Sequence, residues 1–238
     1  MFQSTDTVTR ILRLHPATAR VFERHGMDYC CGGNTSLEAA CAGRGLETAA
    51  LIRELEDIVA PAGSGPDPAS LSLTELAAHI EATHHAYLRE ELPRLDAMTE
   101  RVALVHGHRN SRLEVIRDIW HGVSAVMSAH LDKEEQILFP MVRALEDAAE
   151  TPSFHCGSIA NPVAQMEREH DEIEEGIGRL RELTDGYAAP PWACGTYRAM
   201  IEGLARFEAD TMLHTFKEEN GLFPRAVERE RALAGIHA

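Results

Sequence analysis

One eleven-residue pattern occurs twice in this chain, and both copies carry residue types that bind metal ions. The first copy, HLDKEEQILFP, begins at His130, and the second, HTFKEENGLFP, begins at His214. Each copy has a glutamate four residues after its histidine, Glu134 and Glu218. Residues four apart on an α-helix lie on one face, and imidazole together with carboxylate suits iron, and also manganese or zinc. Each copy therefore predicts a pair of metal ligands.

A further histidine precedes each copy at nearly the same distance. His85 lies 45 residues before His130, and His170 lies 44 residues before His214. In an antiparallel helical hairpin with arms of similar length, two such histidines reach the same height. Two inward carboxylates can each bridge two cations, and burying them without a cation or protons would be very unfavourable. We therefore predict a two-metal site whose ligands are His85, His130, Glu134, His170, His214 and Glu218.

Two other histidines compete for places in this site. His84 is next to His85, and neighbouring residues on a helix point about 100° apart, so both cannot face the site equally. The spacing favours His85. His106 lies 21 residues after His85, about 31 Å along a continuous helix, and would need a sharp bend at Pro93 to reach the metals. Both histidines stay open as further candidates.

Metal-bound histidines are normally oriented by a hydrogen-bond acceptor on their second ring nitrogen. Glu81, Glu174 and Asp210 each lie four residues from a predicted ligand. The spacing makes these three carboxylates candidates for that orienting role.

The hydrophobic periodicity predicts an all-α fold in which four long helices carry the ligands. Ser72 and Glu75 form a capping-box pattern before an apolar run. We expect helices over about 72–105, 112–147, 163–185 and 194–231. Short connections between long helices favour an up-down-up-down four-helix bundle.

A break in composition divides the chain. Residues 60–70 hold three prolines, two glycines and two serines, which is typical of a linker. We predict a small helical domain over 1–59, a linker over 60–71 and the four-helix bundle over 72–238.

The small domain contains two adjacent cysteines, Cys30 and Cys31, followed by two glycines. Thiolates are soft ligands and are redox-active when their pKa is lowered. One interpretation is a buried small residue followed by a flexible turn. The other is a relay that passes iron or electrons to the bundle. Five cysteines in a chain of this length do not indicate a disulfide framework.

The overall charge and the N-terminus restrict the partners. The formal net charge of −15 disfavours nucleic acid and anionic membrane surfaces, which are bound through Lys and Arg. The first residues lack a basic segment followed by an apolar one, and no window approaches 18 uninterrupted apolar residues. We expect a cytoplasmic protein that does not span a membrane.

The repeated pattern ending in Leu-Phe-Pro resembles the hemerythrin-like bundle of the repair-of-iron-centres family, and Asp28-Tyr-Cys-Cys-Gly-Gly33 resembles the small leading domain of that family. The resemblance implies a non-haem, oxo- or hydroxo-bridged di-iron centre. It also implies a role in restoring iron–sulfur clusters damaged by nitric oxide or oxidants, with damaged or apo iron–sulfur proteins as partners. The family ligands fall on the six residues given above, and a family histidine also matches His106.

This chain departs from the oxygen-carrying hemerythrins, which place a second histidine four residues after one ligand histidine and end in an aspartate. Here both places hold glutamate, Glu134 and Glu218, which disfavours reversible O₂ carriage. Three functions stay open: an iron donor for cluster repair under nitrosative or oxidative stress, a sensor module that binds O₂ or NO, and a di-iron NO reductase or oxidase. The sequence also leaves open whether the protein is an enzyme and whether it forms a homodimer.

Overall fold

The computed structural model describes residues 2–8, 10, 11, 15, 18–27, 35–59 and 70–235. The chain divides into two compact units, one of residues 1–64 with 184–205 and one of residues 65–183 with 206–238. Helices are the regular secondary structure of the described residues, with isolated bridges and no strand among them. The predicted all-α class is confirmed.

Three short helices in the described part of residues 1–59 pack around a small apolar core of the first unit. They are α2 (Ala19–Arg24), α3 (Leu37–Ala42) and α4 (Thr48–Val59), and both α2 and α3 contact α4. The buried side chains include Val21, Phe22, Leu37, Cys41 and Leu55. Cys30 and Cys31 lie outside the described residues, as do positions 60–69 of the predicted linker.

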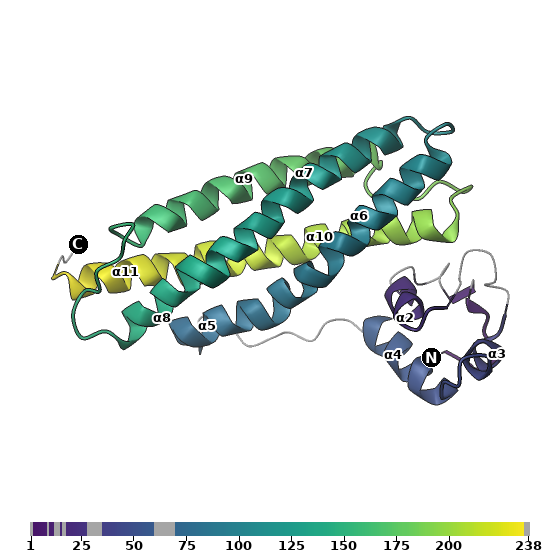
Figure 1. Ribbon diagram of the computed structural model, residues 1–238, viewed down its shortest axis with the longest axis horizontal. Helices are drawn as coiled ribbons and strands as arrows, with labels where there is room; N and C mark the ends of the chain where they lie inside the picture. The colour runs from purple at the N-terminus through teal and green to yellow at the C-terminus, as the bar shows by residue number, and fades with distance from the viewer. Residues whose placement is uncertain are drawn as a thin grey trace. The chain divides into compact units, whose positions relative to one another are not determined.

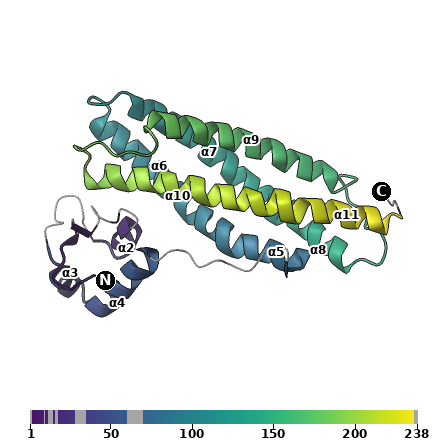
Figure 2. The same cartoon turned by 180° about the vertical axis from the view of Figure 1, so that it is seen from behind.

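Four long helical segments form the bundle, and Figures 1 and 2 show them lying side by side. The second segment contacts the three others, because α7 contacts both α6 and α9, and its continuation α8 contacts both α5 and α11. The predicted four-helix bundle is confirmed. The segments are α5 (Leu73–Ile80), η3 (Glu81–His85) and α6 (Ala86–His106); α7 (Arg112–Lys133), η4 (Glu134–Leu138) and α8 (Phe139–Asp147); α9 (Ala160–Leu183); and α10 (Gly195–Lys217), η5 (Glu218–Leu222) and α11 (Phe223–Leu233).

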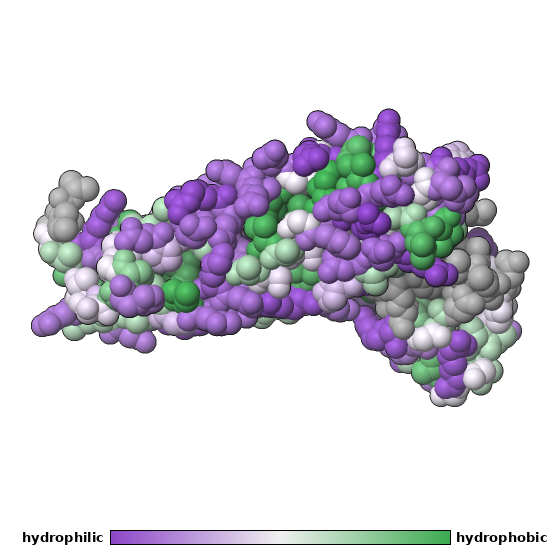
Figure 3. Space-filling view, turned by 45° about the horizontal axis from the view of Figure 1, so that its top comes forward, coloured by the Kyte–Doolittle hydropathy of each residue, from purple (hydrophilic) through white to green (hydrophobic). Residues whose placement is uncertain are grey.

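The bundle encloses an apolar core on one side of the predicted ligands. Leu76 and Ile80 of α5 pack there with Phe139 and Val142 of α8 and with Phe223 of α11. Hydrophilic side chains cover most of the face seen in Figure 3, with smaller apolar patches between them. Among the described residues, no helix has both the length and the apolar character needed to cross a membrane.

A glutamate from another helix caps the N-terminus of α5. The carboxylate of Glu146 accepts hydrogen bonds from the backbone N–H groups of Leu73 and Thr74, both at 2.9 Å, and from the Ser72 hydroxyl at 3.2 Å. The predicted capping box of Ser72 and Glu75 is also present. These contacts satisfy N–H groups that a helix leaves unpaired at its start.

The same arrangement occurs at α9. Glu230 of α11 accepts hydrogen bonds from the backbone N–H of Ile159, at 2.9 Å, and from the Ser158 hydroxyl. Glu230 follows Glu146 by 84 residues, which is the spacing between the two copies of the sequence pattern. The repeat therefore extends from the predicted metal ligands to the capping of the helices that carry them.

A π-helical turn interrupts three of the four segments at the level of the predicted ligands. In two of them, the N–H of Phe139 donates to the carbonyl of Glu134, and the N–H of Phe223 donates to the carbonyl of Glu218. Pro140 follows the first of these turns, and it has no N–H to donate to a carbonyl four residues earlier. The Leu and Phe side chains of both Leu-Phe-Pro sequences are buried and pack in the core. In both copies, the wider turn ends two residues before the proline.

Candidate metal centre

The structure brings all six predicted ligands together in the second unit. Their donor atoms form two groups, and within each group the atoms lie within 4.8 Å of one another. All six side chains are buried. The first group is His85, Glu134, His214 and Glu218, and the second is His130, Glu134, His170 and Glu218.

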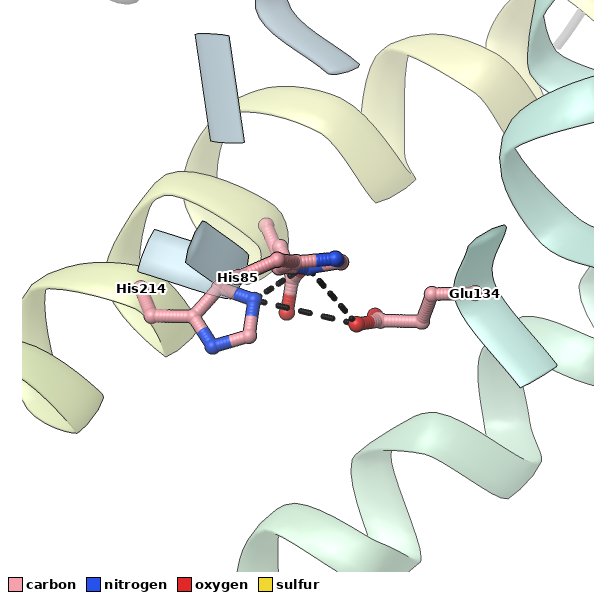
Figure 4. Close-up of side chains that lie close together, drawn as sticks. His85, Glu134 and His214 are labelled. Atoms are coloured by element: carbon pink, nitrogen blue, oxygen red, sulfur yellow. Dashed lines mark hydrogen bonds and ion pairs between the residues drawn. The ribbon is translucent and has the colours of Figure 1, made fainter. Parts of the chain in front are cut away.

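The two glutamates belong to both groups. The Nε2 atoms of His85 and His130 each lie 3.3 Å from Oε2 of Glu134. Figure 4 shows His85 and His214 pointing toward the Glu134 carboxylate from different helices. On the other side, Glu218 lies 2.9 Å from Nε2 of His214. A carboxylate placed between two pairs of imidazoles can bridge two cations.

Three of the six proposed ligands lie at π-helical turns. Glu134 and Glu218 are the first residues of η4 and η5, and His85 is the last residue of η3. A π-helical turn contains one residue more than an α-helical turn closed at the same place, and such turns are common at functional sites. His170 comes from the regular helix α9.

A second layer of carboxylates orients three of the four histidines. Nδ1 of His85 donates to Glu135, and Nδ1 of His170 donates to Glu219, both at 2.9 Å. Nδ1 of His130 donates to Glu169 at 3.1 Å. With the proton on Nδ1, the lone pair of each neutral ring is on Nε2, which faces the shared carboxylates.

The predicted orienting residues were therefore wrong. Glu81 pairs with Arg143 at 2.6 Å, and Asp210 accepts from His84 at 3.0 Å. Glu174 is exposed and lines a cavity on α9. A carboxylate four residues from a histidine lies on the same helix, whereas Nδ1 of the ring points toward a neighbouring helix.

The sequence did contain a signal for two of the orienting residues. Both copies of the pattern have two adjacent glutamates, and the second one, Glu135 or Glu219, is the residue that binds the upstream histidine. No repeated pattern singles out Glu169. Its contact with His130 depends on which helix packs beside His130. Glu169 also pairs with Lys133.

Several buried polar atoms of the centre have no hydrogen-bond partner. They are both carboxylate oxygens of Glu134, Oε2 of Glu218 and Nε2 of His85. Buried polar atoms are almost always hydrogen-bonded, and a buried charge without a counter-ion is very unfavourable. Their convergence fits metal cations bound between them, with two imidazoles for each cation.

Comparison with known proteins agrees with this geometry. The model of the hemerythrin HHE cation binding domain matches residues 76–226. The chain belongs to the hemerythrin family. A second model, ScdA_N, described as a domain of unknown function, matches residues 4–59 of this hemerythrin-family protein.

Two relatives share almost the full length of the chain. The iron–sulfur cluster repair protein YtfE of Yersinia pestis (strain Pestoides F) is 33% identical over 216 residues, which make up 90% of this chain and 93% of the relative. The protein of the same name from Yersinia pseudotuberculosis serotype O:1b (strain IP 31758) has the same identity and coverage. The resemblance to the repair-of-iron-centres family is confirmed, and together with the His/Glu groups it indicates a non-haem iron site.

The two competing histidines lie outside both groups of this hemerythrin-family site. The ring of His84 stacks on that of His214, with centroids 5.5 Å apart. Its Nδ1 donates to Asp210, and its Nε2 accepts from Lys217 at 2.8 Å. His106 is the last residue of α6. The unbroken run of α6 across Pro93 gives no sharp bend that would return it to the ligand layer.

The pKa shifts follow from burial and from the shared carboxylates. Burial by itself lowers the pKa of His130, but the neighbouring charge of Glu134 outweighs it and raises the pKa to about 9. Burial by itself raises the pKa of Glu134, but His130, His85 and His214 together hold it well below its usual value. The carboxylate thus stays ionised and favours positive charge at the surrounding Nε2 atoms. Because a metal ion replaces protons on its ligands, binding should release protons.

Proposed function

We propose that this hemerythrin-family protein helps to repair iron–sulfur clusters damaged by nitrosative or oxidative stress, by donating iron from a two-iron centre. The six residues of the two groups described above are the proposed ligands. Two irons would each take two imidazoles and share Glu134 and Glu218.

The observation that carries this proposal is that one pair of carboxylates belongs to two histidine groups. Two imidazoles and two shared carboxylates do not fill the coordination of an iron ion, which leaves positions for exchangeable ligands. The names of the relatives supply the repair role. Damaged or apo iron–sulfur proteins are the proposed partners.

Iron transfer to an apo iron–sulfur protein tests the function directly. The iron-loaded protein is mixed anaerobically with an apo-ferredoxin and sulfide, and cluster formation is followed by absorbance. We expect clusters to form, and to form far less with a variant that carries both Glu134→Gln and Glu218→Gln. Iron added at the same total concentration to the apo-ferredoxin alone sets the background rate.

The other two functions correspond to different results in the same preparation. A stable and reversible NO or O₂ adduct without iron transfer would support a sensor module and contradict the donor role. Sustained NO consumption with a reductant, without transfer, would support a reductase. Elemental analysis distinguishes a two-iron centre from a one-iron centre, because the two-iron centre requires two irons per chain.

We also propose that Cys30 and Cys31 take part in passing iron or electrons between the small domain and the bundle. Adjacent thiols are suited to transient binding of a soft metal or to redox exchange. Replacing both with serine should leave the iron content of the bundle unchanged and slow transfer to the apo-ferredoxin. Unchanged transfer would contradict the relay. The division into 1–59, 60–71 and 72–238, the cytoplasmic location and dimerisation stay predictions.

A further inference from the structure

A cavity of about 420 Å³ lies against one side of the proposed iron centre. His170 is the proposed ligand that lines it. Its walls come from α9 on one side and from α10 and η5 on the other. The cavity therefore connects one histidine group, that of His130 and His170, with the outside of the bundle.

The lining of this cavity is strongly acidic. Asp171 and Glu174 line it from α9, and Glu219 lines it from η5. Arg181, the only Arg or Lys among the lining residues, pairs with Glu208. Clefts lined by charges of one sign concentrate ions of the opposite sign and speed their association, so this cavity favours cations.

Thr211, in the wall of this cavity, has a buried hydroxyl with no hydrogen-bond partner. Thr211 is 6% exposed, and its Oγ1 makes no hydrogen bond. Thr211 lines the cavity and lies three residues before His214, so both side chains lie on the same helix face. A buried oxygen atom without a partner costs free energy, and a metal ion or its bound water would supply the missing contact.

The opposite side of α9 provides a contrast. Glu172 and Glu175 line a different cavity there, together with Gly176 and Val123. None of the six proposed ligands lines that cavity. Acidic residues thus occur on both sides of the helix, but only one side reaches a proposed ligand.

We propose that the cavity between α9 and α10–η5 is the passage by which iron ions enter and leave the centre, with Asp171, Glu174 and the Thr211 hydroxyl as transient contacts. The inference rests on the proposed iron centre. It implies that the ion bound by His130 and His170 exchanges before the ion bound by His85 and His214.

Two matched double variants test the passage in the full-length protein. Asp171→Asn with Glu174→Gln removes two charges from the cavity, and Glu172→Gln with Glu175→Gln removes two charges from the other side of the same helix. Uptake of Fe(II) by the apoprotein and capture of iron from the loaded protein by a chelator are followed by stopped-flow absorbance. We expect the first variant to slow both rates about tenfold at low ionic strength, with a smaller difference at high salt. The second variant should match the wild-type rates.

Thr211→Val provides a second measurement, since it removes the hydroxyl at nearly constant volume. We expect slower uptake and release with the same iron content at equilibrium. The passage would be overturned if the cavity variant and the opposite-side variant exchanged iron at the same rate, or if only the equilibrium iron content changed. A wild-type protein that binds no iron would instead overturn the proposed centre, so the two failures are distinguishable.

Discussion

At the residue scale, the carboxylates that orient the histidines are as much a part of the centre as the proposed ligands. Glu135 and Glu219 each hold Nδ1 of a histidine on a neighbouring segment, at 2.9 Å. They occupy equivalent positions in the two copies of the pattern. Each carboxylate fixes the ring orientation and makes Nε2 a better donor to a cation.

Glu135→Gln and Glu219→Gln should therefore each weaken iron binding about tenfold to a hundredfold. The amide keeps the shape of the side chain but loses the charge that supports the Nδ1 proton. Competition with a chelator of known affinity measures the effect. Glu172→Gln, on an exposed glutamate outside the centre, is the control, and equal affinity in all three variants would contradict an orienting role.

The proposed ligands could be predicted from the sequence, but not all of their partners. The repeated pattern indicated four of the six ligands, and the matched upstream histidines indicated the other two. The structure brings all six together. Glu169 could not be found in this way, because its contact with His130 depends on the packing of α9 beside α7. The choice of His85 over His84 followed from spacing alone, and the structure places only His85 in a group.

At the element scale, the close approach of α7 and α9 depends on a single glycine. A Cβ atom added at Gly176 would lie 2.3 Å from Cγ2 of the buried Val123. Val is β-branched and has little rotamer freedom in a helix, so it cannot easily move aside. A side chain at this position would push apart the helices that carry His130 and His170.

Gly176→Ala should lower the free energy of unfolding by about 1–3 kcal/mol, the usual cost of overpacking a core. Gly178 is the matched control, since it lies on the same helix and a Cβ there would meet nothing within 4 Å. Gly178→Ala should stabilise the protein by up to about 1 kcal/mol through helix propensity. Urea denaturation measures both, and a stabilising Gly176→Ala would show that α7 and α9 separate at little cost.

The capping of α5 by Glu146 predicts a pH-dependent contribution to stability. Burial raises the pKa of this carboxyl group, but hydrogen bonds from Thr74, Leu73 and Ser72 outweigh it and lower the pKa below its ordinary value of 4.5. The contribution is therefore fully present above the pKa of the unfolded chain and is lost as the pH falls through the lower, folded value.

Glu146→Gln should cost about 1 kcal/mol at pH 7, and the difference from the wild type should shrink below about pH 4. Thermal unfolding at a series of pH values checks this. Exposed Glu150 offers a control, since Glu150→Gln should change stability little at any pH. A constant difference across the whole range would argue against the ionised cap.

At the scale of the whole molecule, the bundle and its predicted ligands depend on each other. Four helices bring together six buried polar side chains, several with atoms that lack hydrogen-bond partners. Anything that binds only the folded state stabilises it. Bound iron should therefore stabilise the folded bundle, in addition to being the ion that the protein is proposed to donate.

The iron-loaded protein should unfold at a higher temperature than the chelator-treated protein. The gain should be about 2.7 kcal/mol when free Fe(II) exceeds its dissociation constant a hundredfold. Calorimetry under anaerobic conditions measures this. A variant with Glu134→Gln and Glu218→Gln should gain little from iron, and an equal gain in both proteins would mean that the stabilising ions bind elsewhere.

The architecture could be predicted because the long segments are strongly periodic and their connections are short. The helices begin and end within a few residues of the expected positions. The π-helical turns could not be predicted, since one extra residue in a turn leaves the apolar spacing nearly intact. Only the backbone hydrogen bonds reveal them.

These turns set a limit on how the chain can change in length. Removing one residue from 81–85, 134–138 or 218–222 would convert the wider turn into a regular α-helical turn and leave the helix beyond it nearly in place. The wider turn beside His85, Glu134 or Glu218 would then be lost. Insertions and deletions accumulated during evolution should accordingly fall in the connections 107–111, 148–159 and 184–194, while those three windows keep a fixed number of residues.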